Sequence, residues 1–398
     1  MSGPLSGIRV VEATFFQNGP FAGVLLADLG ADVIKIEPPR GDPGRALGVS
    51  SECWPMPPYF QAQNRTKRSI SLDLQTPEGR AAAHRLIATA DVFLQNYRLG
   101  VAERLDLGYD ELRRHNPVLI YASVTGLGQE GPQREWGVMD IAGQARSGYL
   151  MLNRSPEGEP TYVTGPGIAD QVGATTMAYG ILGALVHKAR TGEGQALEVS
   201  QFGSMIMVQN NSLHTFLHTG AVGGRLDRQT ARNPLWNTYR CGDGLWMVLC
   251  MSQADRFWPK FCEVVERPDW FADPRYATLA GRTEHAPELI AELDDHFRTR
   301  PRAEWLERLG PAGLSAGPLQ DYQQLREDPQ VIANGYLTEI PIDSGPPMPV
   351  VANPVRYSAT PVVPPALAPE HGQHTEEVLL EIGYDWDEIG ALRQAGAI

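Results

Sequence analysis

Apolar runs of strand length alternate with stretches of helical periodicity through the first half of the chain. The strand-like runs are GIRVVEA, ADVIKIE, SISLDL, DVFLQN and PVLIYASVT. The helix-like stretches are FAGVLLADLG, GRAAAHRLIAT and YDELRRHN, and Thr76 with Pro77 supplies an N-cap and a first helical residue for the second of them. This alternation predicts an α/β fold with a parallel sheet covered on both faces.

The pattern changes in the second half. After Asp170 the run QVGATTMAYGILGALVHKA predicts a long helix, and GQALEVS follows as a further strand. From about Asn233 the chain predicts a hairpin that turns at residues 242–244 and then helices near 258–265 and 287–309. We interpret this part as a smaller α+β domain.

Proline crowds residues 341–369, where a continuous helix is therefore excluded and an extended linker is expected. Beyond it, TEEVLLEIGYDWDEIGALRQ predicts two amphipathic helical pieces. We expect this tail to dock on the first domain.

Charge and composition narrow the class of protein. The 398 residues include 34 Lys and Arg against 47 Asp and Glu, a formal net charge of −13, so nucleic acid is not an expected partner. No basic leader and no apolar run of about 20 residues is present, which predicts a cytoplasmic protein without a membrane segment. The cysteines have neither disulfide-framework nor zinc-ligand spacing; they are Cys53, Cys241, Cys250 and Cys262.

The stretch YASVTGLGQEG contains GLGQEG, which matches the glycine fingerprint of a dinucleotide-binding loop. That fingerprint works where a helix leaves the glycines, because the pyrophosphate lies on the N-terminus of the helix. Here Gly131 is followed by PQREWG, and no acidic residue stands about 20 positions further on to hold a ribose. A turn after a strand is the favoured interpretation.

The first β-α-β unit is a better place for a nucleotide, because open α/β sheets bind ligands at the carboxyl ends of their strands. Its turn, FFQNGPFAG, lacks dinucleotide glycine spacing. Glu37 stands where a ribose-binding acid would, although a solvated carboxylate at a strand end is the commoner case. Pyrophosphate binding in another pose stays open.

Taken together, several segments resemble family III CoA-transferases in the same order along nearly the whole chain. The segments are PLSGIRVVE, GPFAGVLLADLGADVIKIEPPRGDPGR, NRTKRSISLDLQTPEGR, ADVFLQNYRLGVAERLDLGYDELRRHNPVLIYASVTGLGQEGP, IADQVGATTMAYGILGALVHKARTGEGQALEVS and EHGQHTEEVLLEIGYDWDEI. The family includes formyl-CoA and carnitine CoA-transferases and, on the same fold, α-methylacyl-CoA racemases. A turn spelled much like SVTGLGQEGP is common in it and does not bind NAD.

The resemblance implies a domain organisation and an assembly. Residues 1–205 and 365–398 would form a large Rossmann-like CoA-binding domain, and residues 233–335 a small α+β domain. The connections would be a linker at 206–232 and a proline-rich return linker at 336–364. Two such subunits would interlock like chain links as a homodimer.

The resemblance also implies an activity. The enzyme would be an acyl-CoA:carboxylate CoA-transferase that uses acyl-CoA and a free carboxylic acid as substrates and holds no permanently bound cofactor and no metal. The matching nucleophile is Asp170, which would pass through aspartyl-anhydride and aspartyl-CoA thioester intermediates.

The position of Asp170 suits that role. It lies at the predicted start of a long helix, where the helix dipole and free N–H groups favour an ionised carboxylate. Gly165 and Gly167 precede it and would let a thioester approach the backbone. From the residues alone, an ordinary helix N-cap is the preferred interpretation of Asp170.

Donors for the phosphates and the chain of CoA follow from the family pattern. They are Gln17, Asn18, Arg40, Leu72, Asp73, Leu74, Gln75, Asn96, Tyr97, Arg98 and Arg104. Arginine suits phosphate because its planar fork can bind two oxygens at once. Formyl-CoA transferases tend to place a basic residue directly after the KIE strand, where this chain has Pro38 and Pro39, so the role is shifted to Arg40. For Arg40 and Arg98 an ordinary surface salt bridge is an equal alternative.

A second departure separates the branches of the family. The racemases place a His beside an Asp after the SVTG turn, whereas this chain has Met139 before Asp140. Removing a proton next to a thioester needs a base such as His. Transfer is therefore favoured over racemase or isomerase chemistry, and Asp140 is expected to be structural, as a helix cap.

Other features of the sequence bear on which acyl-CoA is the substrate and on which class of protein this is. The glycine-rich loop of formyl-CoA transferases is not seen in LCMSQADRFW, which argues against formyl-CoA as the substrate. Trp236, Tyr239 and Trp258 are candidates for an acyl pocket, with core packing as the commoner role. An NAD-dependent oxidoreductase and a non-catalytic CoA-binding protein are the remaining alternatives.

Overall fold

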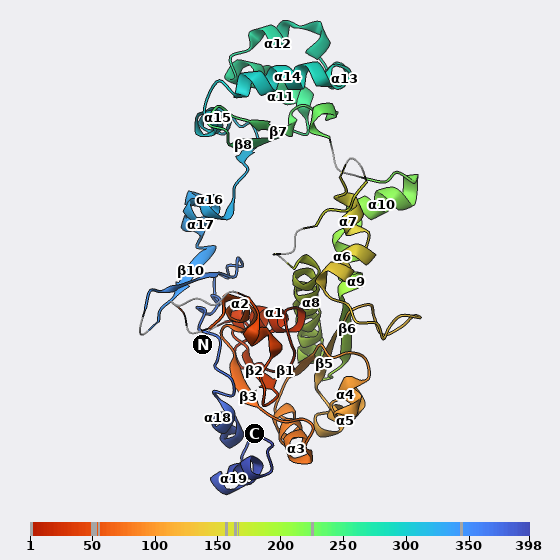
Figure 1. Cartoon of the computed structure of the whole chain (residues 1–398), viewed down its shortest axis with the longest axis vertical. Coiled ribbons are helices and arrows are strands. Elements are labelled where there is room, and N and C mark those ends of the chain that lie inside the picture. The colour runs from red at the N-terminus through yellow and green to blue at the C-terminus, as the bar shows by residue number, and fades with distance from the viewer. Residues whose placement is uncertain are drawn as a thin grey trace. The chain divides into compact units, whose positions relative to one another are not determined.

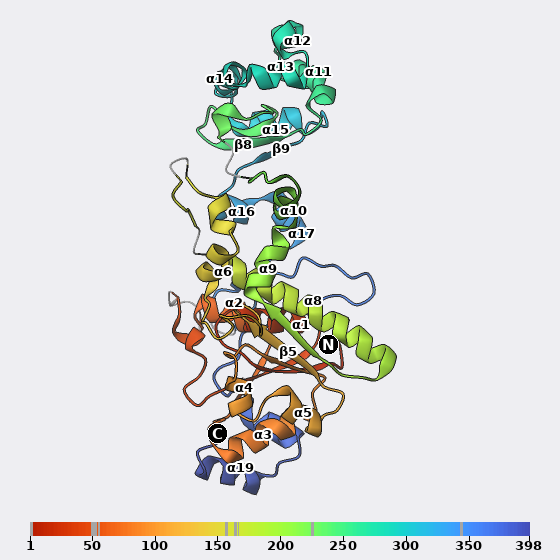
Figure 2. The same cartoon turned by 90° about the vertical axis from the view of Figure 1, so that its right-hand side faces the viewer.

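The computed structural model describes residues 3–48, 54, 56–155, 158–162, 165, 167–223, 227–342 and 345–398. The chain divides into two compact units. One unit comprises residues 1–223 and 335–398, and the other comprises residues 224–334. Each unit is described by itself below (Figures 1 and 2).

The first unit is built on a six-stranded sheet in the order β3-β2-β1-β4-β5-β6, and all of its neighbouring strands are parallel. The strands are β1 (Arg9–Ala13), β2 (Asp32–Glu37), β3 (Arg68–Ser71), β4 (Val92–Gln95), β5 (Ile120–Thr125) and β6 (Ala196–Ser200). The order reverses between β1 and β4, which is the switch point where ligands bind in open α/β sheets.

The strands of this sheet are apolar on both faces, as expected for a sheet with helices on each side. On one face Val10 and Val33 pack with α1 (Asn18–Asp28) and α8 (Ile168–Thr191). On the other face Val11 and Phe93 pack with α3 (Pro77–Ile87), α5 (Tyr109–His115), α18 (Thr375–Glu381) and α19 (Trp386–Gln394). The predicted parallel sheet with two covered faces is confirmed (Figure 2).

The C-terminal tail docks on this unit as predicted. The His374 N–H donates to the Ser69 carbonyl at 2.9 Å, and the Asp73 N–H donates to the Ala397 carbonyl at 2.8 Å. Apolar side chains of α18 and α19 complete the core beneath β3 (Figure 1).

The remaining helices of this unit lie mainly near the carboxyl ends of the strands or lead away from them. They are α2 (Pro58–Asn64), α4 (Val101–Arg104), α6 (Asp140–Arg146), α7 (Tyr149–Leu152), α9 (Gln201–Val208) and α10 (Asn210–Thr219). In the described part of the chain, no helix is both long and apolar enough to cross a bilayer.

The second unit is α+β. Its strands β7 (Trp236–Arg240), β8 (Trp246–Cys250) and β9 (Ala316–Pro318) form an antiparallel sheet. Its helices are α11 (Ala254–Val264), α12 (Pro268–Ala272), α13 (Leu279–Glu284), α14 (Ala286–Phe297), α15 (Arg302–Leu309), α16 (Tyr322–Glu327) and α17 (Pro329–Asn334). Tyr239 and Trp258 are buried in the core of this unit, whereas half of the Trp236 surface is exposed (50%).

Both predicted linkers contain regular structure that the sequence analysis did not predict. Helix α10 lies within residues 206–232. Within residues 336–364, β10 (Leu337–Ile340) pairs with β11 (Met348–Val351) as an antiparallel ribbon. Proline is compatible with such an edge pairing even though it excludes a helix.

Candidate active site

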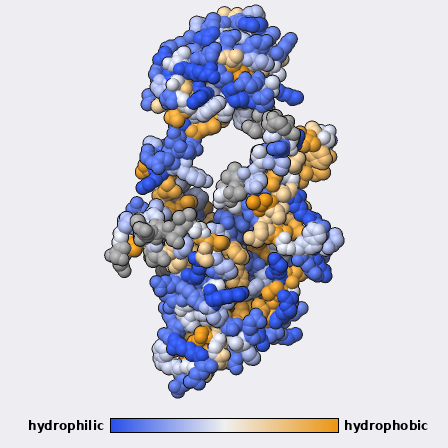
Figure 3. All heavy atoms as spheres, in the orientation of Figure 1, coloured by the Kyte–Doolittle hydropathy of each residue, from blue (hydrophilic) through white to orange (hydrophobic). Residues whose placement is uncertain are grey.

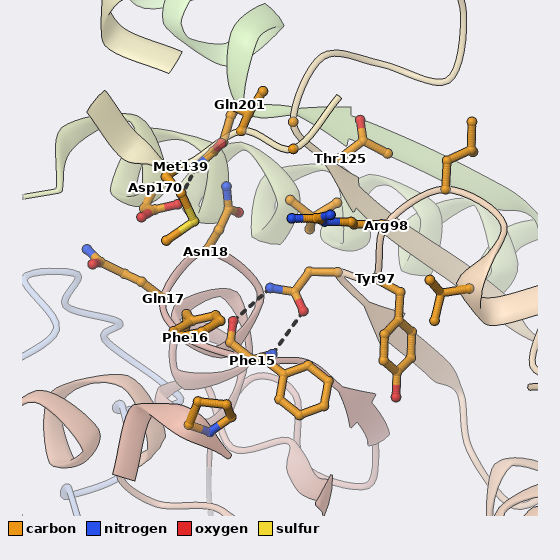
Figure 4. A pocket seen from close by; sticks show the side chains of 18 of the residues that line it. Phe15, Phe16, Gln17, Asn18, Tyr97, Arg98, Thr125, Met139, Asp170 and Gln201 are labelled. Atoms are coloured by element: carbon orange, nitrogen blue, oxygen red, sulfur yellow. Dashed lines mark hydrogen bonds between the residues drawn. The ribbon is translucent and has the colours of Figure 1, made fainter. Parts of the chain in front are cut away.

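A cavity of about 520 Å³ opens at the carboxyl edge of the large sheet, at the switch point between β1 and β4. Its wall is formed by residues that follow β1, β2, β4 and β5, by the loop before α6 and by the starts of α8 and α9. All of these elements belong to the first unit. Figure 4 shows side chains that line this space, with Asp170, Asn18 and Gln201 near one another.

The turn after β1 is held by polar contacts on both sides. The Asn96 side chain accepts from the Phe15 N–H at 2.9 Å and donates to the Phe15 carbonyl at 2.8 Å (Figure 4). The buried Lys35 donates to the Thr14 carbonyl at 2.6 Å and pairs with Asp42 at 2.9 Å. These contacts keep Phe16 in the left-handed region (φ 64°), from which the next two side chains, Gln17 and Asn18, reach the cavity.

Asp170 is the third residue of α8, and Gly167 is the N-cap, with φ 56°. Glycine suits this position because φ is positive, and a Cβ there would also lie 2.5 Å from the Gln17 Nε2, so the Gln17 amide would have to move. Because Gly167 is the N-cap and Asp170 lies inside the first turn, the Asp170 carboxylate does not cap its own helix. It faces the cavity instead (Figure 4).

Within the described part of the chain, the Gln201 Nε2 donates a hydrogen bond to the Asp170 Oδ1. Burial, followed by the negative charge of Asp140, raises the pKa of Asp170 to about 7. The Gln201 hydrogen bond and the nearby Asn18 amide act in the opposite direction. The carboxylate is thus more basic than an ordinary aspartate.

Asp140 explains why the helix N-terminus does not lower that pKa. Its Oδ1 accepts from the N–H groups of Ala169 and Asp170, at 2.7 and 3.2 Å, and its Oδ2 accepts from the Gln144 side chain at 2.6 Å. Asp140 is a cap, as predicted, but the helix it caps is α8. The expectation that free N–H groups keep Asp170 ionised is wrong, because Asp140 occupies them and adds a like charge.

Three arginines line the cavity, namely Arg40, Arg98 and Arg134. Within the described residues, Arg40 and Arg98 form no ion pair, whereas Arg134 lies 3.9 Å from Glu135. The Arg98 guanidinium packs on Gly137, where a Cβ would lie 2.9 Å from its Nη2. These are the cationic donors available to an anionic ligand.

The structure brings some of the predicted CoA-binding residues to the Asp170 cavity and leaves others elsewhere. Those that line it are Gln17, Asn18, Arg40, Asn96, Tyr97 and Arg98. Leu72, Asp73, Leu74, Gln75 and Arg104 do not line it. Leu72 is fully buried in the core and its N–H donates to the Glu37 carbonyl at 2.8 Å, so this residue is not accessible to a ligand.

The sequence analysis missed Gln201, Trp136, Arg134 and Tyr59 as residues of the site. Gln201 and Trp136 line the cavity, and Tyr59 lies close enough to Asp170 for that charge, after burial, to raise the pKa of the phenol to about 12. The sequence analysis assigned Asp140 a structural role but did not predict that its charge raises the pKa of Asp170. The position of Gln201 could have been predicted from the sequence. This residue directly follows the strand GQALEVS, and the carboxyl ends of parallel strands share one edge of the sheet.

Met139 lines the cavity and is 67% exposed. It has no titratable group with which to move a proton. Among the described residues, no cluster of His, Cys, Asp and Glu has the arrangement of a metal site. After β5, residues 126–139 form turns and no helix begins before Asp140, so GLGQEG is not followed by a dinucleotide-binding helix, as predicted.

Comparison with known proteins gives consistent matches across the chain. The model of CoA-transferase family III matches residues 5–375. The (R)-2-hydroxy-4-methylpentanoate CoA-transferase of Clostridioides difficile is 31% identical over 99% of both chains. The acetyl-CoA:oxalate CoA-transferase of Acetobacter aceti is 35% identical over 89% of this chain and 90% of its own.

A solved structure shares the fold. The CaiB/BaiF family protein from Brucella suis matches with a TM-score of 0.86 and 32% identity, over 96% of this chain and all of the other (100%).

Proposed function

Because the chain belongs to CoA-transferase family III, we propose that it moves CoA between carboxylic acids with Asp170 as the nucleophile. The observation that carries this proposal is the placement of Asp170. Its carboxylate faces a cavity of about 520 Å³ and is not bound by its own helix. Its raised pKa of about 7 makes the ionised form a stronger nucleophile than an ordinary aspartate.

The proposed reaction has four additions. The Asp170 carboxylate attacks the thioester carbonyl, the C–S bond breaks, and an aspartyl anhydride and CoA thiolate form. The thiolate attacks the aspartyl carbonyl carbon and releases the donor acid, which leaves aspartyl-CoA thioester. The acceptor carboxylate attacks that carbon and releases the thiolate, which then attacks the acceptor carbonyl and frees both acyl-CoA and the Asp170 carboxylate.

Arg40 and Arg98 are proposed to bind CoA phosphates, together with polar groups of Gln17 and Asn96 at the turn. Both guanidiniums line the cavity without an ion pair in the described part of the chain, which favours a ligand over a surface salt bridge. Four residues of the predicted set outside the cavity are proposed to contact parts of CoA that extend beyond it; they are Asp73, Leu74, Gln75 and Arg104. The predicted role of Leu72 is dropped because the residue is fully buried. CoA enters as substrate, with no permanently bound cofactor.

The identity of the two acids is left to experiment. The relatives named above differ in the acid they use, although their identities to this chain are similar. Acyl-CoA racemase or isomerase activity is the second candidate, and the exposed Met139 at the cavity counts against it because it offers no proton-transfer group.

We further propose that the protein is a cytoplasmic homodimer whose units are connected through residues 206–232 and 336–364, with the domain boundaries given in the sequence analysis. Exposed apolar side chains on α9 and α10 support an interface, and Figure 3 shows apolar surface there; they are Met207, Val208, Phe216 and Leu217. Native mass spectrometry measures the subunit number.

The activity is tested with a panel of acyl-CoAs and free acids, by following the new acyl-CoA by liquid chromatography. The proposal expects transfer that depends on both substrates. Exchange of the α-proton without transfer to any added acid would establish the isomerase alternative instead.

A further inference from the structure

The Asn18 side chain is buried close enough to Asp170 to lower its pKa, yet its contact with Asp170 lacks normal hydrogen-bond geometry. It is 6% exposed, and neither its Nδ2 nor its Oδ1 forms a hydrogen bond of normal geometry with the described part of the chain. An unpaired buried amide costs about 1–3 kcal/mol, so such a group in a native fold calls for a reason. Asn18 lines the cavity beside Asp170 (Figure 4).

One glycine of α8, Gly173, leaves room for Asn18 at that position. Gly173 is three residues after Asp170 and so lies on the same face of the helix. A Cβ on Gly173 would lie 2.6 Å from the Asn18 Nδ2, so only glycine leaves room for the amide there. By contrast, a Cβ on Gly183, two to three turns further along α8, would contact nothing within 4 Å.

The second amide is already in place. Gln201 is the first residue of α9, 5% exposed, and its Nε2 donates to the Asp170 Oδ1. Its backbone is fixed because the Ser200 hydroxyl caps α9 by accepting from the Gly203 N–H at 3.0 Å. One oxygen of Asp170 is therefore held, and Oδ2 is left to attack.

We propose that the side-chain amides of Gln201 and Asn18 together bind the oxyanion that forms on the Asp170 carbonyl during transfer, a role that rests on Asp170 being the nucleophile. Two of the four additions occur at the Asp170 carbonyl carbon, one by CoA thiolate and one by the acceptor carboxylate. In each, the π electrons of the C=O bond move onto Oδ1 and return when the leaving group departs. Gln201 holds Oδ1 throughout, and Asn18 Nδ2 donates when negative charge develops there.

The backbone explains why side chains are needed for this task. Oxyanion sites commonly use N–H groups at a helix N-terminus. Here the N–H groups of Ala169 and Asp170 donate to Asp140 and are not available. Among the described titratable groups, those whose charge interacts with that of Asp170 are Asp140 and Tyr59, and neither is a cation that could take this role.

The test compares apolar replacements of similar size with matched controls. Gln201→Met and Asn18→Leu each remove one donor, and Gly173→Ala displaces the Asn18 amide without removing it. Gln209→Met removes a glutamine just after α9 whose side chain donates to the carbonyls of Ser147 and Met205, and Gly183→Ala adds a methyl group where there is space. Circular dichroism and the subunit number are checked for every variant.

Removal of one oxyanion donor is expected to lower kcat by about 10²–10³-fold, with the KM for acyl-CoA changed less than about threefold. The two controls keep kcat within about twofold of the parent enzyme. The pH profile supplies a readout that a loss of packing would not move. Because the Gln201 hydrogen bond lowers the pKa of Asp170, Gln201→Met shifts the acid limb of kcat/KM to higher pH.

Rapid-quench mass spectrometry separates this inference from the proposed function. If the parent enzyme forms the Asp170 adduct but Gln201→Met and Asn18→Leu turn over at the parent rate, the oxyanion role is overturned while the nucleophile stands. A rise in KM with kcat unchanged overturns it as well, since the amides would then serve CoA binding. If the parent enzyme transfers CoA with no Asp170 adduct, the proposed function fails first.

Discussion

The Asp140 carboxylate accepts a hydrogen bond from the backbone N–H of Asp170 at 3.2 Å, and so one acid caps the helix that carries the other. Two carboxylates share a half-buried region at the start of α8, and their like charges oppose ionisation of Asp170. The site therefore combines a fixed carboxylate with a raised pKa.

The pH dependence of transfer follows from this pair. With a pKa of about 7, the protonated fraction of Asp170 grows as the pH falls below 7, and a protonated carboxyl cannot attack a thioester. The kcat/KM for acyl-CoA is expected to fall on the acid side with an apparent pKa near 7. A profile that stays flat down to about pH 5 would contradict a free carboxylate with this pKa.

Asp140→Asn changes that profile in a defined direction. It removes the negative charge that raises the pKa of Asp170 while it keeps an oxygen able to accept from the α8 N–H groups. The acid limb is expected to move to lower pH, which is measured from kcat/KM at the same pH values. Movement of the acid limb to higher pH would show that the Asp140 charge does not raise the pKa of Asp170.

Arg98→Gln tests phosphate binding. If the guanidinium binds a CoA phosphate, its loss raises the KM for acyl-CoA by about tenfold or more and weakens the salt dependence of kcat/KM. Arg190→Gln, at the exposed end of α8, is the matched control and leaves both unchanged. Equal effects of the two substitutions would assign the arginine effect to overall charge.

A buried ion pair supports the turn that carries Gln17. Lys67 pairs with Glu12 at 2.8 Å and donates to the Pro20 carbonyl at 2.8 Å, and both side chains are inaccessible to solvent (0%/0%). Lys67→Met removes one partner of the buried pair and is expected to cost about 3–5 kcal/mol in the free energy of unfolding.

Urea unfolding followed by circular dichroism measures that cost. The control is Arg114→Met, which breaks the exposed pair with Glu111 and is expected to cost less than about 1 kcal/mol. If Lys67→Met lowers the free energy of unfolding as little as Arg114→Met does, the buried pair contributes little to the stability of this fold.

Much of the fold could be predicted from local patterns. The strands β1, β2, β4 and β5 lie in predominantly apolar runs between turn residues, and this is typical of a sheet buried on both faces. The pairing of β10 with β11 was missed, because proline composition reports where a helix cannot form and says little about which edge a short strand meets.

The family pattern made Gln17, Asn96 and Arg98 predictable, and all three line the cavity. The pKa of Asp170 was not predictable, because it depends on which acid reaches the α8 N–H groups. Asp140 is 30 positions earlier, and only the folded chain brings its Oδ1 to within 3.2 Å of the Asp170 N–H. Gly137 and Gly173 likewise show their role only through the side chains packed on them.

The central claim is that Asp170 becomes covalently modified during transfer. The most direct measurement incubates the enzyme with a competent acyl-CoA, adds hydroxylamine or borohydride, and locates the modified residue by peptide mass spectrometry. The account predicts a mass change at Asp170 that requires acyl-CoA, together with loss of transfer in Asp170→Ala. Full activity of Asp170→Ala, or turnover with the modification at another residue, would contradict it.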